Sequence, residues 1–199
     1  MRLLLFISVL VFGSFLLGAP AFAAAPAVTP DAAAPVKRDH ASIINDLFAS
    51  LKKAKTEQAA LAIADDIRGE WANSGSATVN LLMQWSDAAV GKKDYTAALD
   101  FLDQAIVLKP QFAEGWNHRA TLHFMMNNYT KSMADIEKTL ALEPRHFGAL
   151  TGLGLILLSY DRKEQALKVY AKALEVYPLM RDVQKQVGDI EEQIAGSRT

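Results

Sequence analysis

The sequence predicts an all-α protein that is built from repeated helical hairpins. Three prolines, Pro110, Pro144 and Pro178, follow one another at intervals of 34 residues, and each is the last residue of a closely similar sequence segment. Between them, apolar residues recur three and four positions apart, which is the spacing of one helix face. The chain has 199 residues and no cysteine, so its ordered part must be stabilised by buried apolar surface and not by disulfides.

The proline register divides the second half of the chain into three units of equal length: 79–112, 113–146 and 147–180. In each unit, positions four, seven and eleven share one face of a first helix, and positions twenty, twenty-four and twenty-seven share one face of a second. Position eight is always small (Ser86, Ala120, Gly154), which lets the two helix axes approach closely. The proline cannot continue the second helix and therefore ends each unit at a fixed point.

The repeat length, the small residues and the closing proline resemble the tetratricopeptide repeat family over residues 79–180. The resemblance implies a solenoid in which consecutive hairpins stack side by side. It also implies that the first helices line a concave groove, where members of the family hold a peptide segment. Three residues depart from the family pattern, because Arg119, His123 and Thr139 stand where apolar side chains are usual.

By the same resemblance, positions two, five, nine and twelve of each unit line the groove. We expect nine of these residues to bind the partner: Met83, Asp87, Val90, Asn117, Thr121, Phe124, Thr151, Leu155 and Leu158. The second position adds Asn80, Glu114 and Gly148 to the lining. The set is polar at one end and apolar at the other, and it lacks the Lys/Arg/Asn set that clamps a terminal carboxylate in some family members.

The first 23 residues predict a secretory signal peptide that is cleaved after Ala23, with Ala25 as the alternative site. Arg2 is followed by the apolar run 3–17 and by the small-residue site Ala21-Phe22-Ala23. A membrane anchor is the alternative interpretation, but a helix of this run is only about 22 Å long, against a hydrocarbon core of about 30 Å. No later segment is long and apolar enough to span a membrane. Residues 24–37 are rich in proline and alanine and are expected to be a disordered linker.

The regions beside the repeats also have helical patterns. Residues 38–78 predict a helix pair and a loop, which we interpret as a degenerate, repeat-like N-terminal cap without the closing proline. Residues 181–199 predict an amphipathic capping helix and a tail, because terminal units of a stacked array need one polar face. The expected total is about nine helices and no strands.

Composition argues against most kinds of chemistry. The net charge of -1 provides no excess of lysine and arginine for binding nucleic acid. No phosphate-binding glycine motif or nucleophile motif occurs. His118 and His123 are five residues apart, whereas two metal ligands on one helix are typically four apart. We therefore expect no catalytic residues, no metal and no cofactor, and we do not expect an enzyme.

Two features leave alternatives open. Arg119 can form an internal ion pair, with Asp135 or with Asp100 and Asp103, or it can face a ligand. The segment 151–158 is apolar on every side, so either the C-terminal helix covers it or a hydrophobic partner segment does.

The expected function is that of an exported adaptor, which binds a protein or a peptide segment of an envelope protein and serves cell-envelope maintenance or assembly. We expect it in the periplasm because of the predicted signal peptide and the lack of cysteine. The bacterial assignment follows from a resemblance to short exported repeat proteins of Gram-negative bacteria. We also expect a monomer or a weak homo-oligomer. The alternative is a stoichiometric accessory subunit of an envelope enzyme or secretion complex.

Overall fold

The computed structural model of the 199-residue chain describes residues 39–196. The expected signal peptide, 1–23, and linker, 24–37, lie outside this range. Within it the chain forms nine helices and no strand, which confirms the all-α class. The helices are α1 (His40–Lys53), α2 (Glu57–Ala72), α3 (Ala77–Gly91), α4 (Tyr95–Leu108), α5 (Ala113–Met125), α6 (Tyr129–Leu142), α7 (Phe147–Ser159), α8 (Lys163–Val176) and α9 (Arg181–Gly196).

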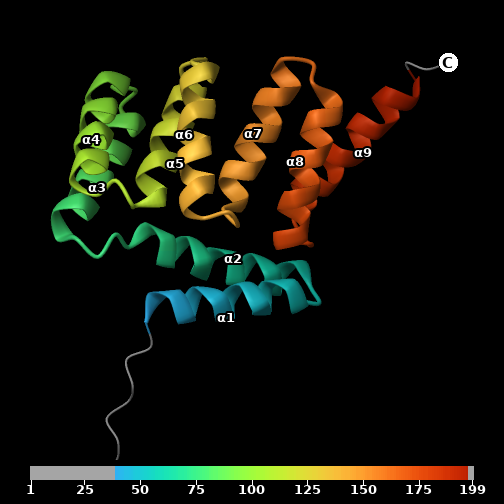
Figure 1. Cartoon of the computed structure of the whole chain (residues 1–199), viewed down its shortest axis with the longest axis horizontal. Helices are drawn as coiled ribbons and strands as arrows, with labels where there is room; N and C mark the ends of the chain where they lie inside the picture. The colour runs from blue at the N-terminus through green and yellow to red at the C-terminus, as the bar shows by residue number, and fades with distance from the viewer. Residues whose placement is uncertain (1–38, 197–199) are drawn as a thin grey trace, which may run out of the picture. The chain divides into compact units, whose positions relative to one another are not determined.

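The helices from α3 onward form a stack of hairpins. In each of the pairs α3–α4, α5–α6 and α7–α8, the two helices lie against each other, and each pair contacts the next (Figure 1). The helix α9 packs on α8 at the end of the stack. The core is therefore divided into clusters within and between neighbouring hairpins, as stacked repeats require.

The turn inside each hairpin uses the same backbone conformation. Lys93, Asn127 and Asp161 occupy the same position of the three repeats, and all have a positive φ, at 61°, 59° and 55°. The amide of the residue that follows each of them donates a hydrogen bond back into the first helix, for example from Asp94 to the carbonyl of Ala89 over 2.9 Å. This closure caps the first helix and starts the second in the same direction in every repeat.

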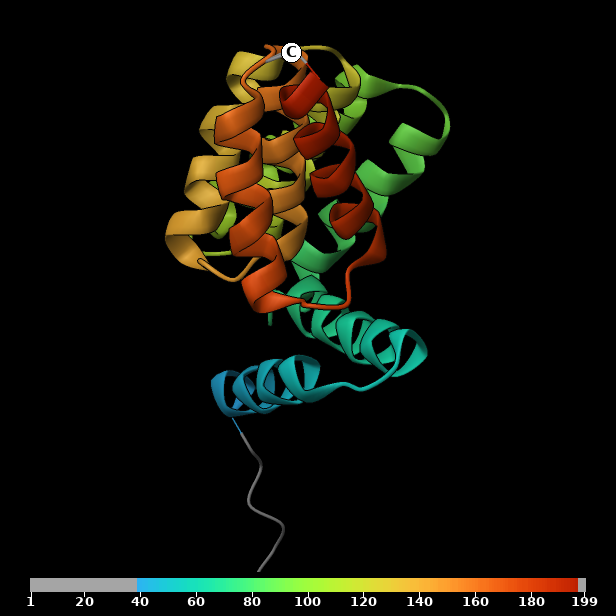
Figure 2. The ribbon, with the colours of Figure 1, turned by 90° about the vertical axis from the view of Figure 1, so that its right-hand side faces the viewer.

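The N-terminal hairpin α1–α2 forms as a helix pair, but it does not add a further layer to the stack as a repeat-like cap would. It lies across one end of the other hairpins, as Figures 1 and 2 show, and it contacts α5 and α8. Aromatic packing determines this position. The ring centroid of Phe147 lies 4.9 Å from that of Trp71 and 5.6 Å from that of Tyr177. Phe48 of α1 completes the cluster.

Candidate functional site

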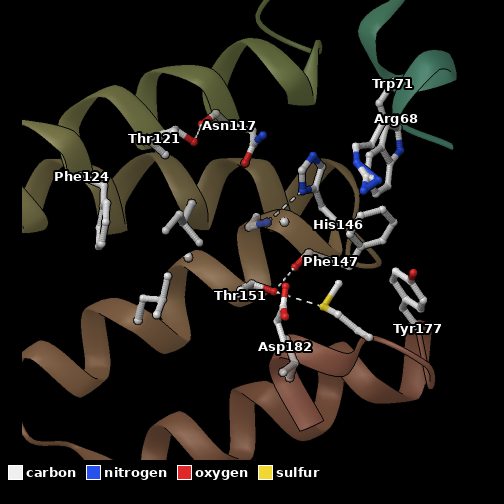
Figure 3. Close-up of a pocket in the computed structure, with 18 of the residues that line it drawn as sticks. Arg68, Trp71, Asn117, Thr121, Phe124, His146, Phe147, Thr151, Tyr177 and Asp182 are labelled. Atoms are coloured by element: carbon white, nitrogen blue, oxygen red, sulfur yellow. Dashed lines mark hydrogen bonds between the residues drawn. The ribbon is translucent and has the colours of Figure 1, made fainter. Parts of the chain in front are cut away.

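A pocket of about 570 Å³ lies between the first helices α5 and α7, with the hairpin α1–α2 at one side (Figure 3). The helix α5 contributes Asn117, Thr121 and Phe124, and α7 contributes Thr151 and Leu155. The segment that joins α8 to α9 forms another wall, and α6 contributes Ser132 and Ile136.

The structure brings five of the nine expected groove residues into this pocket, namely Asn117, Thr121, Phe124, Thr151 and Leu155. Their side chains lie on the same faces of α5 and α7 because positions five, nine and twelve are three and four residues apart. Leu155 is 37% exposed, which leaves an apolar side chain accessible in the pocket wall.

The other four residues lie elsewhere. Met83 and Asp87 line a second, smaller pocket of about 310 Å³ between α2, α3 and α5, and Met83 is itself buried. Val90 and Leu158 line neither of these two pockets, so their part in partner binding stays a prediction. Both lie near the end of a first helix and pack, partly buried, on the hydrophobic clusters of their own hairpins.

Sequence reasoning missed the walls that α2 and the α8–α9 segment provide. Arg68 and Trp71 of α2 line the pocket, as do Tyr177 and Asp182 (Figure 3). One signal was present in the sequence: Tyr177 occupies the position before the closing proline, where the other two repeats have Lys109 and Glu143. An aromatic residue there indicates an extra packing partner for the third repeat.

A chain of hydrogen-bonded carboxylates and histidines separates the two pockets, and Glu114 lines both of them. One oxygen of Glu114 lies 2.8 Å from Nε2 of His146, and the other lies 3.1 Å from Nε2 of His118. Nδ1 of His118 lies 3.4 Å from Asp87. His118 therefore connects Asp87 of α3 to Glu114 of α5, and His146, which is the N-cap of α7, contacts Glu114 of α5.

Two pKa shifts follow from these contacts. Burial alone would lower the pKa of His118, but its hydrogen bonds to Asp87 and Glu114 outweigh burial and raise the pKa to about 9. Burial alone would raise the pKa of Glu114, but hydrogen bonds from His118 and His146 outweigh it and hold this pKa well below its usual value. A carboxylate and an imidazolium are therefore the charged forms beside the pockets at neutral pH.

His146 fixes the contact between the N-terminal hairpin and the stack. Its Nδ1 accepts a hydrogen bond from the amide of Ala149 over 3.0 Å, which caps α7. The proton of the neutral ring must then be on Nε2, and this N–H donates a hydrogen bond to Glu114. The imidazole stacks on Trp71, with ring centroids 4.1 Å apart and planes 11° apart.

Arg119 forms the internal ion pair that was one of its two alternatives. Its Nε and Nη2 donate to the two carboxylate oxygens of Asp135 over 2.8 and 2.7 Å, and its Nη1 donates to Asp103 over 2.7 Å. The guanidinium also lies 4.9 Å from the centroid of the Trp116 ring. The hydrogen bonds to Asp135 are the main cause that raises the pKa of Arg119. These contacts join α5 to α6 and to α4 of the preceding repeat.

The apolar segment 151–158 is divided between the two alternatives. Leu157, together with Leu150, packs in one cluster with Val183 and Ile190 of α9. Thr151 and Leu155 instead line the pocket. The cluster with α9 therefore covers one face of α7, and the preceding hairpin covers another, where Ile156 packs with Ala120 and Ile136. The face with Thr151 and Leu155 remains accessible in the pocket.

Residues 39–196 contain neither a metal-binding cluster nor a membrane-spanning helix. No group of three or more histidine, aspartate or glutamate side chains in this range could hold a metal ion. None of the helices in this range combines the length and the apolar character that a membrane span requires.

Comparison with known proteins agrees with this architecture. The family model of the tetratricopeptide repeat matches residues 147–178 of this chain. A TPR repeat-containing protein of Rhizobium etli is 52% identical over 156 residues, which cover 78% of this chain and 76% of the relative.

Two solved structures share the fold. The first tetratricopeptide domain of Spaghetti (RPAP3), bound to the HSP90 peptide SRMEEVD, superposes with a TM-score of 0.57 at 19% identity and covers 60% of this chain and 95% of that domain. The Sgt2 domain of Aspergillus fumigatus has a TM-score of 0.57 at 20% identity, with 62% of this chain and 83% of that domain covered. The repeat register, the stacked hairpins and the extent of the similarity to the Rhizobium protein together show that this chain belongs to the tetratricopeptide repeat family.

Proposed function

We propose that this protein is an exported adaptor that holds a peptide segment of a cell-envelope protein in the pocket between α5 and α7. The proposal is supported by the apolar side chains of Phe124 and Leu155 in the pocket lining, which also contains the hydroxyl and amide groups of Asn117, Thr121 and Thr151. Apolar surface with a few polar groups that fix orientation is typical of a site for a peptide or a small molecule.

A solved structure that shares the fold supports this choice of ligand. The RPAP3 domain, which shares the fold, holds an HSP90 peptide in its solved structure. In this chain the hairpin α1–α2 and the segment around Tyr177 add walls to the pocket, so a bound segment would be enclosed from more than the two first helices. We infer a short segment with at least one apolar side chain, which would lie against Leu155.

The periplasmic location rests on the predicted signal peptide at residues 1–23. The bacterial source of the similar protein, Rhizobium etli, supports a bacterial envelope as the setting. Cell-envelope maintenance or assembly is the role we propose for the complex. The alternative role remains a stoichiometric accessory subunit of an envelope enzyme or secretion complex.

The test is a selection from a displayed peptide library on the purified protein, followed by measurement of Kd for the selected peptides. We expect Leu155→Asp and Thr121→Arg to weaken binding at least tenfold, because each places a charge in the apolar part of the pocket. Val107→Asp is the matched control, since Val107 is 80% exposed on α4 and lines neither pocket.

The outcome separates the two roles. An adaptor selects peptides whose binding depends on Leu155 and Thr121. An accessory subunit selects none, and instead co-purifies with one partner in a fixed ratio. Selected peptides that bind all three variants equally well would show that the pocket between α5 and α7 is not the binding site.

A further inference from the structure

The two ends of the hairpin stack differ in polarity. At the C-terminal end, α9 exposes charged residues to solvent, among them Arg181, Lys185 and Glu191. At the other end, α3 exposes Leu81 and Trp85, at 42% and 47% of their surface. Terminal repeats of a stacked array normally carry a polar outer face, as α9 does. The outer face of α3 does not follow this rule.

The corresponding positions in the other repeats form the contact between hairpins. Leu81 stands at position three of its repeat, where the second repeat has Gly115, and a Cβ at Gly115 would lie 3.3 Å from Phe112 and 3.5 Å from Ile106 of the preceding repeat. Trp85 stands at position seven, where Arg119 reaches Asp103 of the preceding repeat over 2.7 Å.

The third repeat shows the same use of these positions. Ala149, at position three, is 1% exposed, and Leu153, at position seven, packs with Ala120 and Ile136 of the preceding repeat. Leu81 and Trp85 therefore lie on a surface that, in both of the later repeats, is covered by another hairpin.

The exposed stripe on α3 consists of Thr78, Leu81, Trp85 and Ala88, which are three and four residues apart and carry no charge. Phe101 of α4, which is partly buried, extends it, because its ring lies 5.6 Å from that of Trp85. We call this surface the α3 stripe. A large aromatic pair on an exposed and uncharged helix face is typical of a docking surface.

We propose that the α3 stripe is a self-association surface, on which a second copy of the chain docks with its own α3 stripe. The partner must present an uncharged helical face, and the same stripe of a second copy does so without opposing like charges. The charged outer surface of α9 is a poor match for the α3 stripe, so head-to-tail stacking of copies is disfavoured. A pair that uses the same face on both sides also closes on itself and stops at two chains.

The size of the surface predicts a weak dimer. A helix of 15 residues, such as α3, is about 22 Å long, and a hairpin is about 20 Å wide. Two such faces bury about 900 Å² in total, which is below the roughly 1,200 Å² of a stable standard interface. The dimer should therefore dissociate on dilution. This surface is separate from the pocket between α5 and α7, so the inference does not depend on the proposed function.

Sedimentation velocity from low micromolar to several hundred micromolar protein tests the proposal. The wild-type protein should shift from the mass of one chain to the mass of two. Trp85→Arg and Leu81→Arg should each remain monomeric over the same range, because they place two like charges across the interface. Circular dichroism melting should show that both variants fold, since both side chains are already substantially exposed in one chain.

Val107→Arg is the matched control, because it adds the same charge to an exposed apolar position of the same hairpin. Six residues separate it from Phe101, which places it about 120° around α4, and it should dimerise like the wild type. Leu155→Asp should also dimerise, because Leu155 lies in the pocket. A wild-type protein that stays monomeric, a dimer that survives both arginine substitutions, or species that grow beyond two chains would each overturn the proposal.

Discussion

Gly154 of α7 lies directly against the ring of Tyr170 in α8, so closely that a Cβ on Gly154 would overlap three ring carbons. Gly154 and Tyr170 stand at positions eight and twenty-four of the third repeat. These positions hold Ser86 and Leu102 in the first repeat and Ala120 and Ile136 in the second. The smallest residue therefore faces the largest one. The volumes of the two positions compensate each other, which keeps the two helices of each hairpin close together.

Gly154→Ala should lower the free energy of unfolding by about 1–3 kcal/mol, because the new methyl group must displace a fully buried tyrosine ring. Gly188→Ala is the matched control, since Gly188 lies within α9 and a Cβ there meets no atom within 4 Å. It should stabilise the protein by up to about 1 kcal/mol through helix propensity alone. Urea unfolding monitored by circular dichroism measures both changes.

A double-mutant cycle checks the cause. Combining Gly154→Ala with Tyr170→Leu gives a pair similar to Ala120 and Ile136 of the second repeat. Gly154→Ala should therefore lower the free energy of unfolding less in the Tyr170→Leu protein than in the wild type. If Gly154→Ala is equally harmful in both backgrounds, the effect does not come from this contact.

Tyr170→Phe should leave stability unchanged or raise it by about 1 kcal/mol. The Tyr170 hydroxyl is buried and has no hydrogen-bond partner in the part of the chain that the structure describes, so its removal relieves an unsatisfied polar group. The variant should also change the pH dependence. Burial raises the pKa of Tyr170 to about 12, so the unfolded chain loses this proton near pH 10 before the folded chain does.

Proton linkage gives the direction in which Tyr170 changes stability with pH. The Tyr170 contribution to stability is fully present below pH 10 and is lost as the pH rises toward 12. Thermal unfolding of both proteins between pH 9 and pH 12 measures this effect, and Tyr170→Phe should lose less stability over that interval. A variant whose stability falls as steeply as that of the wild type would contradict the assignment. Lysine titration is common to both proteins and cancels in the difference.

The residues that the sequence could place are those whose position follows from the repeat. Position eight and position twenty-four are determined by the 34-residue register, and Gly154 was expected to permit close packing on that ground alone. The groove positions came from the family resemblance, and five of these residues on α5 and α7 line the pocket, whereas Leu158 of α7 does not. In these cases local periodicity and the tertiary contact agree.

The position of α1–α2 could not be predicted in this way. Its helical pattern is clear, but the contact of Trp71 with His146 joins residues that are 75 positions apart and that follow no repeat. The roles of Arg68 and Tyr177 in the pocket depend on that contact and were missed with it. The pattern of a helix indicates which face is buried but not which distant surface covers it.

Asp87→Asn should lower the pKa of His118 by about one unit, because it removes one of the two carboxylates that raise this pKa to about 9. The ion pairs of His118 stabilise the folded state fully below its ordinary pKa of 6.5, and the stabilisation is lost as the pH rises through 9. An NMR titration of the His118 ring measures the shift. Glu191→Gln, at the far end of the stack, should leave the titration unchanged. Equal titration of wild type and Asp87→Asn would show that Asp87 does not contact His118 in solution.

Lys93→Gly should stabilise the protein by about 1 kcal/mol. Lys93 has a φ of 61°, a left-handed conformation that is unfavourable for a residue with a Cβ and favourable for glycine at the end of a helix. Asn127 and Asp161 adopt the same conformation in the later repeats, but their short polar side chains tolerate it better, so Asn127→Gly should gain less. Chemical unfolding of the two variants measures the difference. Because Lys93 is exposed, no packing contact is lost, and a destabilised Lys93→Gly protein would mean that this turn does not hold a positive φ in solution.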